Sequence, residues 1–314
     1  MPADDAIAVS RYHTKNSLTP SINYKPILIP MKKVIAFLAV VLLALPVAFA
    51  QQKTSCCVKP TAEATTQFAM LGSDKSFQAK HDNPLPFTLQ NQQGKMVSFK
   101  TPDGKAGSAY FIQAAKKTDN YLLVIHEWWG LNDYIKQEAD KLAKELGNVN
   151  VLALDLYDGK VAADRENAVK YMQSVTPERG RAIVNGAIAY AGKDPDIATI
   201  GWCFGGSWSL QAAIEAGSKA EAAVIYYGMP ERDIERLKKL KAPVLGIFAE
   251  QDGSITPEIV NDFEQKVKLA GKDVTIKMYD AVHGFANPSN PKYNKQATED
   301  AHKLAIDFLK KHLD

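Results

Sequence analysis

The stretch I-G-W-C-F-G-G-S, residues 200–207, decides how this chain is interpreted. It follows an apolar run typical of a buried strand and precedes a run typical of a helix, so Cys203 lies at the turn between them. Gly201 and Gly205 stand two residues before and two residues after the cysteine. This spacing is typical of a nucleophile elbow, a strained turn in which side chains at either glycine position would collide.

Such a turn has chemical consequences for the thiol. It lifts the Cys203 sulfur above the sheet and directs the backbone N–H of Phe204 toward a reacting carbonyl, so Phe204 is predicted to be one oxyanion-hole donor. The positive end of the following helix favours a thiolate or an oxyanion. The pattern therefore predicts that Cys203 is a nucleophile.

Outside the elbow, apolar runs and helical stretches alternate along the chain. Strands are predicted at residues 96–100, 108–114, 121–126, 149–154, 197–201, 222–227, 244–249 and 274–279. Helices are predicted at residues 134–146, 165–173, 177–191, 206–216, 232–240, 257–270 and 298–313. Apolar strands that alternate with helices are typical of a parallel sheet covered by helices on both faces, and the first two strands, joined by a short connection, should form an antiparallel hairpin. The sequence predicts one α/β domain with a mostly parallel sheet of about eight strands.

Two more polar residues follow late strands. Asp252 comes just after the strand at 244–249, and His283 comes just after the strand at 274–279. The carboxyl ends of parallel strands form one edge of the sheet, where active sites lie. Nucleophile, acid and histidine in this order are typical of the α/β-hydrolase fold, so Cys203, Asp252 and His283 are predicted as a catalytic triad. Taken alone, the aspartate is also typical of a turn or a helix cap.

The stretch H-E-W-W-G-L-N, residues 126–132, follows an early strand. A zinc-binding helix would need a second histidine four residues after His126, but that position is Gly130, so no metal is predicted here and no cofactor elsewhere. In an α/β-hydrolase the loop after an early strand supplies the second oxyanion donor, which we assign to the Trp128 N–H. All four tryptophans lie near residue 127 or the elbow, and Trp202 is expected to line the substrate pocket.

The N-terminal region is expected to be separate from this domain. Residues 31–50 combine a basic start, an apolar run and small residues, the pattern of a cleaved signal peptide. Residues 1–50 are therefore expected to be absent from the mature protein, which is exported to the periplasm or the medium; a retained anchor is the alternative. Residues 51–94 are polar and lack periodicity, so a tether that wraps the surface is expected, followed by the hydrolase domain at 95–314.

Charge and cysteine usage narrow the partners. The net charge is +3, but residues 1–50 hold five basic and two acidic residues, which leaves 33 of each in the remainder. A neutral body gives no reason to expect nucleic acid or an anionic membrane as partner. We expect a monomer or small homo-oligomer that acts on a small molecule, without stable membrane insertion after signal cleavage. Cys56 and Cys57 are sequence neighbours that seldom pair, and Cys203 is expected to be a free thiol.

Together, H-E-W-W-G-L-N, G-W-C-F-G-G, A-E-Q-D-G-S and V-H-G-F-A resemble the dienelactone hydrolase family in residues and in spacing. The resemblance covers roughly residues 95–314. It implies the α/β-hydrolase fold, the triad of Cys203, Asp252 and His283, and hydrolysis of small esters or lactones. It also implies that Glu127 contacts the resting thiol and helps to generate the thiolate when substrate enters.

The chain departs from the family pattern where a substrate carboxylate would bind. Family members use arginines for this carboxylate, but Asn287 stands four residues after His283, at the position of one of them. Arg165 is the candidate for the other, with Val169 where a tyrosine is expected one turn later. Arg165 is equally typical of an exposed helix charge. Asn287, Arg165 and Trp202 are therefore the candidate substrate-binding residues.

A binding protein and a redox protein are the two alternatives to hydrolysis through an acyl-cysteine. A binding protein with a hydrolase fold would be indicated by loss of a triad member, and none is lost. A redox protein would use Cys203 as a peroxidatic thiol, with Cys56 or Cys57 resolving it. Redox chemistry gives no reason for Asp252 and His283 to stand where a triad needs them, so hydrolysis is the preferred interpretation.

Overall fold

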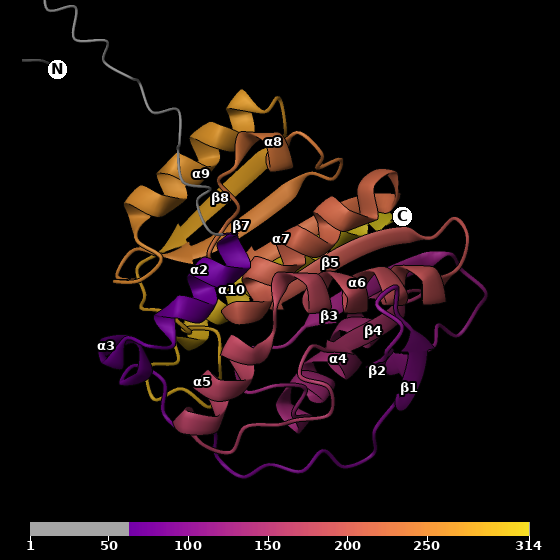
Figure 1. The fold of residues 1–314 in the computed structure, drawn as a ribbon, viewed down its shortest axis with the longest axis horizontal. Helices are drawn as coiled ribbons and strands as arrows, with labels where there is room; N and C mark the ends of the chain where they lie inside the picture. Colours follow the sequence, from indigo (N-terminus) through magenta and orange to yellow (C-terminus); the bar gives the residue numbers. More distant parts are fainter. Residues whose placement is uncertain (1–62, 314) are drawn as a thin grey trace, which may run out of the picture. The chain divides into compact units, whose positions relative to one another are not determined.

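The computed structural model describes residues 63–313 of the 314-residue chain. The predicted signal peptide, Cys56 and Cys57 lie outside the described residues. Eight strands form one sheet in the order β1-β2-β4-β3-β5-β6-β7-β8, shown in Figure 1. The strands are β1 (Lys95–Lys100), β2 (Ala106–Ile112), β3 (Asn120–Ile125), β4 (Asn150–Asp155), β5 (Asp196–Trp202), β6 (Ala220–Tyr226), β7 (Val244–Ala249) and β8 (Val274–Tyr279).

Strand direction matches the prediction. β1 pairs antiparallel with β2, and β2 pairs antiparallel with β4, whereas every other neighbouring pair is parallel. The predicted antiparallel start of a mostly parallel sheet is therefore confirmed. All residues of β4, β6 and β7 except Glu221 are buried, because helices cover both faces of these strands.

Nine helices of four residues or more occur within residues 63–313. They are α2 (Ala64–Leu71), α3 (Lys75–Gln78), α4 (Asp133–Leu146), α5 (Arg165–Ser174), α6 (Pro177–Ala191), α7 (Phe204–Ala216), α8 (Ile234–Leu237), α9 (Pro257–Leu269) and α10 (Lys295–Leu313). The predicted helix at 232–240 is shorter in the structure, where α8 spans only Ile234–Leu237. It begins later than predicted because the Glu231 carboxylate accepts hydrogen bonds from the backbone N–H groups of Arg232 (2.9 Å) and Asp233 (3.0 Å).

The strand order distributes the helices over two layers. The chain steps from β3 to β4 in one direction and then returns past β3 to β5, and right-handed crossovers place the connecting helices on opposite faces. α4 lies on one face, where α10 packs against it, and α6 and α7 pack together on the other. In Figure 1, α6 and α7 lie on the viewer's side and α10 is seen behind them.

The N-terminal segment is more structured than the tether that the sequence predicts. α2 packs on α7 and α5. Figure 1 shows α2 as the indigo helix beside α7. Phe68 of α2 and Phe77 of α3 are fully buried, and their rings meet edge to face at 5.8 Å. Segment 63–82 is therefore part of the packed domain.

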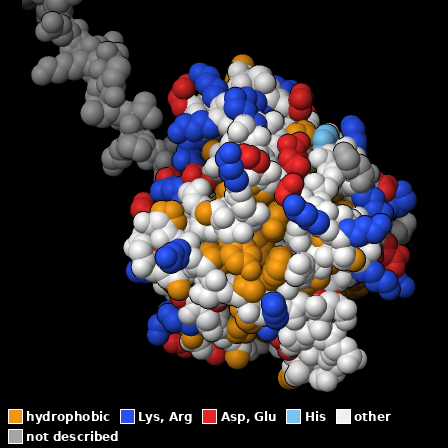
Figure 2. Space-filling view, turned by 90° about the vertical axis from the view of Figure 1, so that its right-hand side faces the viewer, with side chains coloured by type: hydrophobic (Ala, Val, Ile, Leu, Met, Phe, Trp, Pro, Cys, Tyr) orange, Lys and Arg blue, Asp and Glu red, His pale blue; other side chains and the backbone are white. Residues whose placement is uncertain are grey.

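The surface carries charges of both signs, as the balanced composition predicts. Figure 2 shows one face, on which hydrophobic side chains gather centrally and lysine, arginine and acidic side chains surround them. Within residues 63–313 no helix is both long enough and apolar enough to cross a bilayer.

The packing of α2 can be tested with a pair of variants on the same helix. Phe68→Ala should lower the free energy of unfolding by about 3 kcal/mol or more, because a buried ring leaves a cavity. Met70→Ala, at a side chain that is 65% exposed, should change it by less than about 0.5 kcal/mol. Urea denaturation measures both values. Equal, small effects would mean that α2 is not docked in solution.

Candidate active site

The elbow between β5 and α7 has the strained geometry that its glycines predict. Cys203 adopts a φ of 58° and a ψ of −119°, in the left-handed region that non-glycine residues rarely occupy. A Cβ atom at Gly201 would lie 2.1 Å from the Gly205 carbonyl oxygen, and one at Gly205 would lie 2.2 Å from that of Ile125. The Cys203 N–H donates to the Tyr226 carbonyl at 2.9 Å, which ties the turn to β6.

The three residues of the predicted triad meet at this turn. The Cys203 Sγ lies 3.5 Å from the His283 Nε2, and the His283 Nδ1 lies 2.5 Å from the Asp252 Oδ2. The other oxygen of Asp252 accepts from the backbone N–H groups of Ser254 (2.8 Å) and Ile255 (3.0 Å). All three side chains are buried. The loops after β7 and β8 thus bring the acid and the histidine to the cysteine.

The charges in this cluster are set by competition between burial and hydrogen bonding. Burial raises the pKa of Asp252, but the charge and hydrogen bond of His283 and two backbone donors lower it below its ordinary value. Burial lowers the pKa of His283, but the charge and hydrogen bond of Asp252 outweigh this and raise it to about 10. His283 and Asp252 therefore form a buried ion pair at neutral pH.

Burial raises the pKa of Cys203, so the resting side chain is a thiol. The charge of Glu127 raises this pKa further, while His283 and the Phe204 N–H lower it. Trp128 belongs to the loop that directly follows β3, and the last carbonyls of β3 touch the elbow at Gly205. Phe204 directly follows the nucleophile, and Trp128 follows the strand that packs against the elbow, so both stay the predicted oxyanion donors.

Glu127 is buried, and its hydrogen-bond partner is Asn287 rather than the thiol. The Asn287 Nδ2 donates to the Glu127 Oε2 at 2.5 Å, while the Asn287 Oδ1 accepts from the N–H and the Oγ of Ser289, both at 2.8 Å. Burial raises the pKa of Glu127 to about 7, opposed by the His283 charge and by Asn287 and Tyr227. Glu127 is therefore close to half ionised at neutral pH.

Arg165 does not lie where a residue that binds a substrate carboxylate would lie. Its Nε donates to the His81 carbonyl at 2.5 Å, and its Nη2 pairs with the Asp82 Oδ1 at 2.6 Å. The guanidinium therefore fastens the N-terminal segment to α5.

The N-terminal segment supplies site residues that the sequence analysis did not find. The His81 Nε2 lies 3.9 Å from the Cys203 Sγ, and the ring of Phe77 packs against His283 with centroids 5.6 Å apart. Burial and the neighbouring His283 charge lower the pKa of His81 to about 3, so its ring is neutral. Cys203 is only 2% exposed beneath this cover. The sequence signal for this packed segment is the pair of aromatic residues at 68 and 77 within a polar stretch.

Comparison with known proteins shows to which family the chain belongs. Residues 108–313 match the dienelactone hydrolase family. The chain belongs to the dienelactone hydrolase family. Membership makes it a hydrolase of esters or lactones, in agreement with the resemblance seen in its motifs.

Individual relatives agree with this assignment. The chain is 31% identical over 235 residues to the protein usf of Aquifex pyrophilus, an alignment that covers 70% of this chain and 99% of the relative. It is 29% identical to a carboxymethylenebutenolidase of Pseudomonas sp., covering 67% of this chain and 93% of that enzyme. Among solved structures, a dienelactone hydrolase-like promiscuous phosphotriesterase from metagenomic libraries superposes with a TM-score of 0.61 at 20% identity, over 71% of this chain and all of that one. The predicted α/β-hydrolase fold is confirmed.

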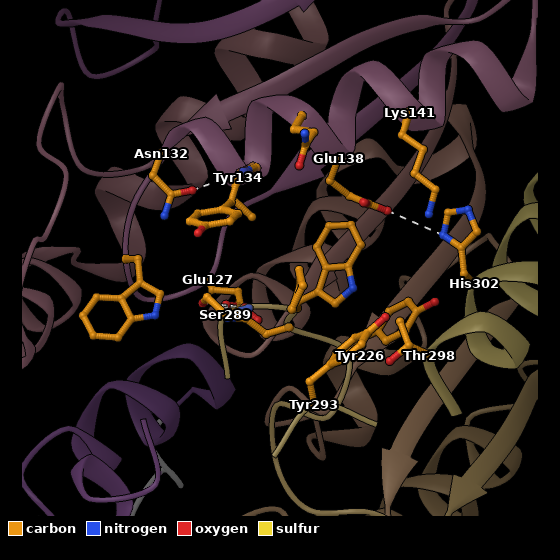
Figure 3. A pocket seen from close by; sticks show the side chains of 17 residues that line it. Glu127, Asn132, Tyr134, Glu138, Lys141, Tyr226, Ser289, Tyr293, Thr298 and His302 are labelled. Atoms are coloured by element: carbon orange, nitrogen blue, oxygen red, sulfur yellow. Dashed lines mark hydrogen bonds and ion pairs between the residues drawn. The ribbon is translucent and has the colours of Figure 1, made fainter. Parts of the chain in front are cut away.

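A cavity of about 160 Å³ lies next to Glu127, between α4, α10 and the loop after β8 (Figure 3). Glu127 and Asn287 line it, together with polar side chains such as Glu138, Lys141 and His302. Its aromatic lining residues are Trp129, Tyr134, Trp202, Tyr226 and Tyr293. Trp202 lines this cavity and packs against Tyr226 with ring centroids 5.5 Å apart. At the far end Glu138 of α4 reaches His302 of α10 at 3.5 Å, drawn as a dashed line in Figure 3.

The raised pKa of Glu127 predicts a pH-dependent contribution to stability. An acid whose pKa is higher in the folded state than in the unfolded state stabilises the fold at low pH and loses this contribution as pH rises. Between the ordinary value of 4.5 and about 7, the wild type should lose about 3 kcal/mol relative to Glu127→Gln. Urea denaturation of both proteins from pH 4.5 to 8 measures the difference. A difference that does not vary with pH would contradict a raised pKa.

Proposed function

We propose that this chain hydrolyses small esters or lactones by covalent catalysis, with Cys203 as nucleophile and His283 and Asp252 completing the triad. The observation that carries the proposal is the line of contacts from the Cys203 Sγ through the His283 imidazole to the Asp252 carboxylate, at a strained elbow. Such a line is the arrangement that nucleophilic catalysis needs, because the base must reach the nucleophile and be oriented by a third group.

The first step is removal of the thiol proton, and Glu127 is the acceptor that fits. His283 already carries a proton at neutral pH, because its pKa is about 10. The pKa of Glu127 is about 7, so its carboxylate is available as a base in this pH range. The Cys203 proton passes to Glu127, and the resulting thiolate is stabilised by the imidazolium of His283. Two groups with separated pKa values thus divide the acid and base roles.

Acylation and deacylation then follow, and each proton and leaving group has a defined acceptor. The thiolate attacks the substrate carbonyl, whose oxygen is stabilised by the N–H groups of Trp128 and Phe204. The C–O bond to the leaving group breaks, the proton of His283 Nε2 goes to the departing oxygen, and an acyl-cysteine remains. Water attacks this thioester while His283 accepts the proton of the water, which releases the acid and regenerates the thiolate.

The cavity, which Glu127 and Trp202 line but Cys203 does not, supports a substrate of limited size. A cavity of about 150 Å³ lined by apolar side chains holds benzene, so a volume of about 160 Å³ suits a ring of five or six atoms. Its five aromatic side chains favour a flat substrate group, while Lys141, Glu138 and His302 can contact a polar one. These dimensions support a small aryl ester or an unsaturated lactone as substrate.

Redox chemistry at Cys203 receives less support than hydrolysis. A peroxidatic thiol is typically exposed and has a lowered pKa, whereas Cys203 is 2% exposed and burial raises its pKa. The part of the chain that the structure describes contains no second cysteine near it.

Cys203→Ala should abolish hydrolysis of chromogenic aryl esters and lactones, because the acyl-cysteine cannot form. The fold should persist, since Gly201 and Gly205 provide the space that the turn needs. Intact mass spectrometry of wild type mixed with ester should show one acyl group per chain. Cys56→Ser and Cys57→Ser are the matched controls and should retain both activity and the acyl adduct. Full activity in Cys203→Ala would exclude cysteine catalysis.

Glu127→Gln should lower the turnover number by about a hundredfold or more, because the amide keeps the shape of the side chain but cannot accept the thiol proton. Steady-state kinetics at pH 7 measure the loss. Asn287→Asp is the companion change, since it removes the donor to Glu127 and should shift the pH at which activity rises. Unchanged turnover in Glu127→Gln would restrict Glu127 to a structural role.

A further inference from the structure

Three potential metal ligands converge in the site, one of them from outside the predicted triad. The Sγ of Cys203 and a ring nitrogen each of His81 and His283 all lie within 4.8 Å of one another. Hydrolysis through the triad gives His81 no task. An imidazole that is only 8% exposed and lies 3.9 Å from the nucleophile still requires a physical explanation.

Hydrogen bonds on the far side of both rings set the direction of their lone pairs. The His81 Nδ1 lies 2.9 Å from the Phe77 carbonyl oxygen, and the His283 Nδ1 lies 2.5 Å from the Asp252 carboxylate. Both partners can only accept, so each Nδ1 carries a proton. The neutral His81 ring therefore presents a bare Nε2 toward the sulfur, and the His283 ring does so once its Nε2 proton is lost. Histidines that bind metals typically donate their other N–H to a carbonyl or a carboxylate in this way.

With His283 protonated, the thiol accepts from the His283 Nε2 and can donate its own proton to the His81 Nε2, which lies 3.9 Å away. Once the thiol proton is lost, the lone pair of the His81 Nε2 faces a thiolate and no donor remains between them. A cation bound to the three atoms satisfies the thiolate and both nitrogens together.

The distances suit a tetrahedral ion with sulfur and nitrogen ligands. Zinc binds thiolate sulfur at about 2.3 Å and imidazole nitrogen at about 2.0–2.1 Å, which separates the ligands by about 3.6 Å in a tetrahedron. The observed separations from the Cys203 Sγ are 3.5 Å to His283 and 3.9 Å to His81. The two imidazole nitrogens lie within 4.8 Å of each other, whereas a tetrahedral ion separates them by about 3.3 Å, so the His81 ring moves toward the sulfur and His283 when the ion binds.

The local charge is also balanced for a divalent ion. One thiolate and the Asp252 carboxylate, which is bonded to the ligand His283, together carry two negative charges. A dication with these two groups leaves the buried cluster neutral when Glu127, whose charge also acts on Cys203, is protonated, and this avoids the cost of an uncompensated charge in the interior. Three protein ligands leave a fourth position for water.

We propose that His81, Cys203 and His283 form a binding site for Zn²⁺, and that the bound ion occupies the catalytic thiol and stops hydrolysis. Binding replaces the thiol proton, and any proton on the His283 Nε2, with metal–ligand bonds, and these protons pass to solvent. No oxidation change occurs. The inhibitory effect rests on the proposed cysteine mechanism, but the binding site rests on geometry alone.

The binding site can be tested with Co²⁺, a spectroscopic substitute for Zn²⁺, added to reduced, chelator-treated full-length protein. A thiolate-to-cobalt charge-transfer absorption should grow and saturate at one equivalent, and Zn²⁺ should displace it. Zn²⁺ should inhibit hydrolysis of a chromogenic ester over the same concentration range, and a chelator should restore the rate.

The decisive variant is His81→Phe, which removes the ligand but keeps a ring against Phe77 and Trp128. Its affinity for Co²⁺ and Zn²⁺ should fall at least about tenfold. His312→Phe, on the terminal helix α10, is the matched control and should bind as the wild type does. If circular dichroism shows that His81→Phe does not fold, His81→Gln replaces it.

Two results would overturn the site: no charge-transfer absorption in the wild type, or equal metal affinity in the wild type and the His81 variant. The outcome is separable from the proposed catalysis. A charge-transfer band that depends on His81 in a protein without esterase activity would support the metal site and refute the hydrolytic mechanism. Esterase activity without the band would do the reverse.

Discussion

The strained backbone at Cys203 is the constraint on which the site depends. A left-handed conformation at a non-glycine residue costs about 1–3 kcal/mol and persists only where surrounding structure enforces it. Here β5 and α7 hold the turn from either side, and the N–H of Cys203 is bonded to the Tyr226 carbonyl of β6. The direction of the sulfur, the aim of the Phe204 amide and the start of α7 all follow from this one turn.

The number of hydrogen bonds that each buried carboxyl receives decides its charge. Asp252 accepts from His283 and from two backbone amides, so it stays ionised although it is buried. Glu127 has one close donor, Asn287, and is therefore poised between its two protonation states. Similar burial thus produces a fixed charge on one side of the site and an exchangeable proton on the other.

Much of this arrangement could be predicted from the sequence because its signals are local. Strand ends are recognisable from apolar runs, and residues that follow them in a parallel sheet must share an edge, which brings Cys203, Asp252 and His283 together. Contacts between distant segments carry no such local pattern. Asn287 lies 160 residues from its partner Glu127, and the only sign of the packed N-terminal segment is a pair of aromatic residues in polar surroundings. The carboxylate-binding role of Arg165 rests on the family resemblance alone, and no local pattern indicates its ion pair with Asp82.

The packed N-terminal segment also affects how this protein can diverge from its relatives. The match to the family begins at residue 108, whereas one wall around the nucleophile comes from residues 68–81. The reaction chemistry and the cover above it are therefore encoded in separate stretches of the gene. Exchange of residues 63–94 alone, which precede β1, can change which molecules reach the thiol while the sheet and its loops stay intact. A recombinant fragment that begins at β1 would expose the rings of Trp128, Phe204 and His283 and would report the selectivity of a different enzyme.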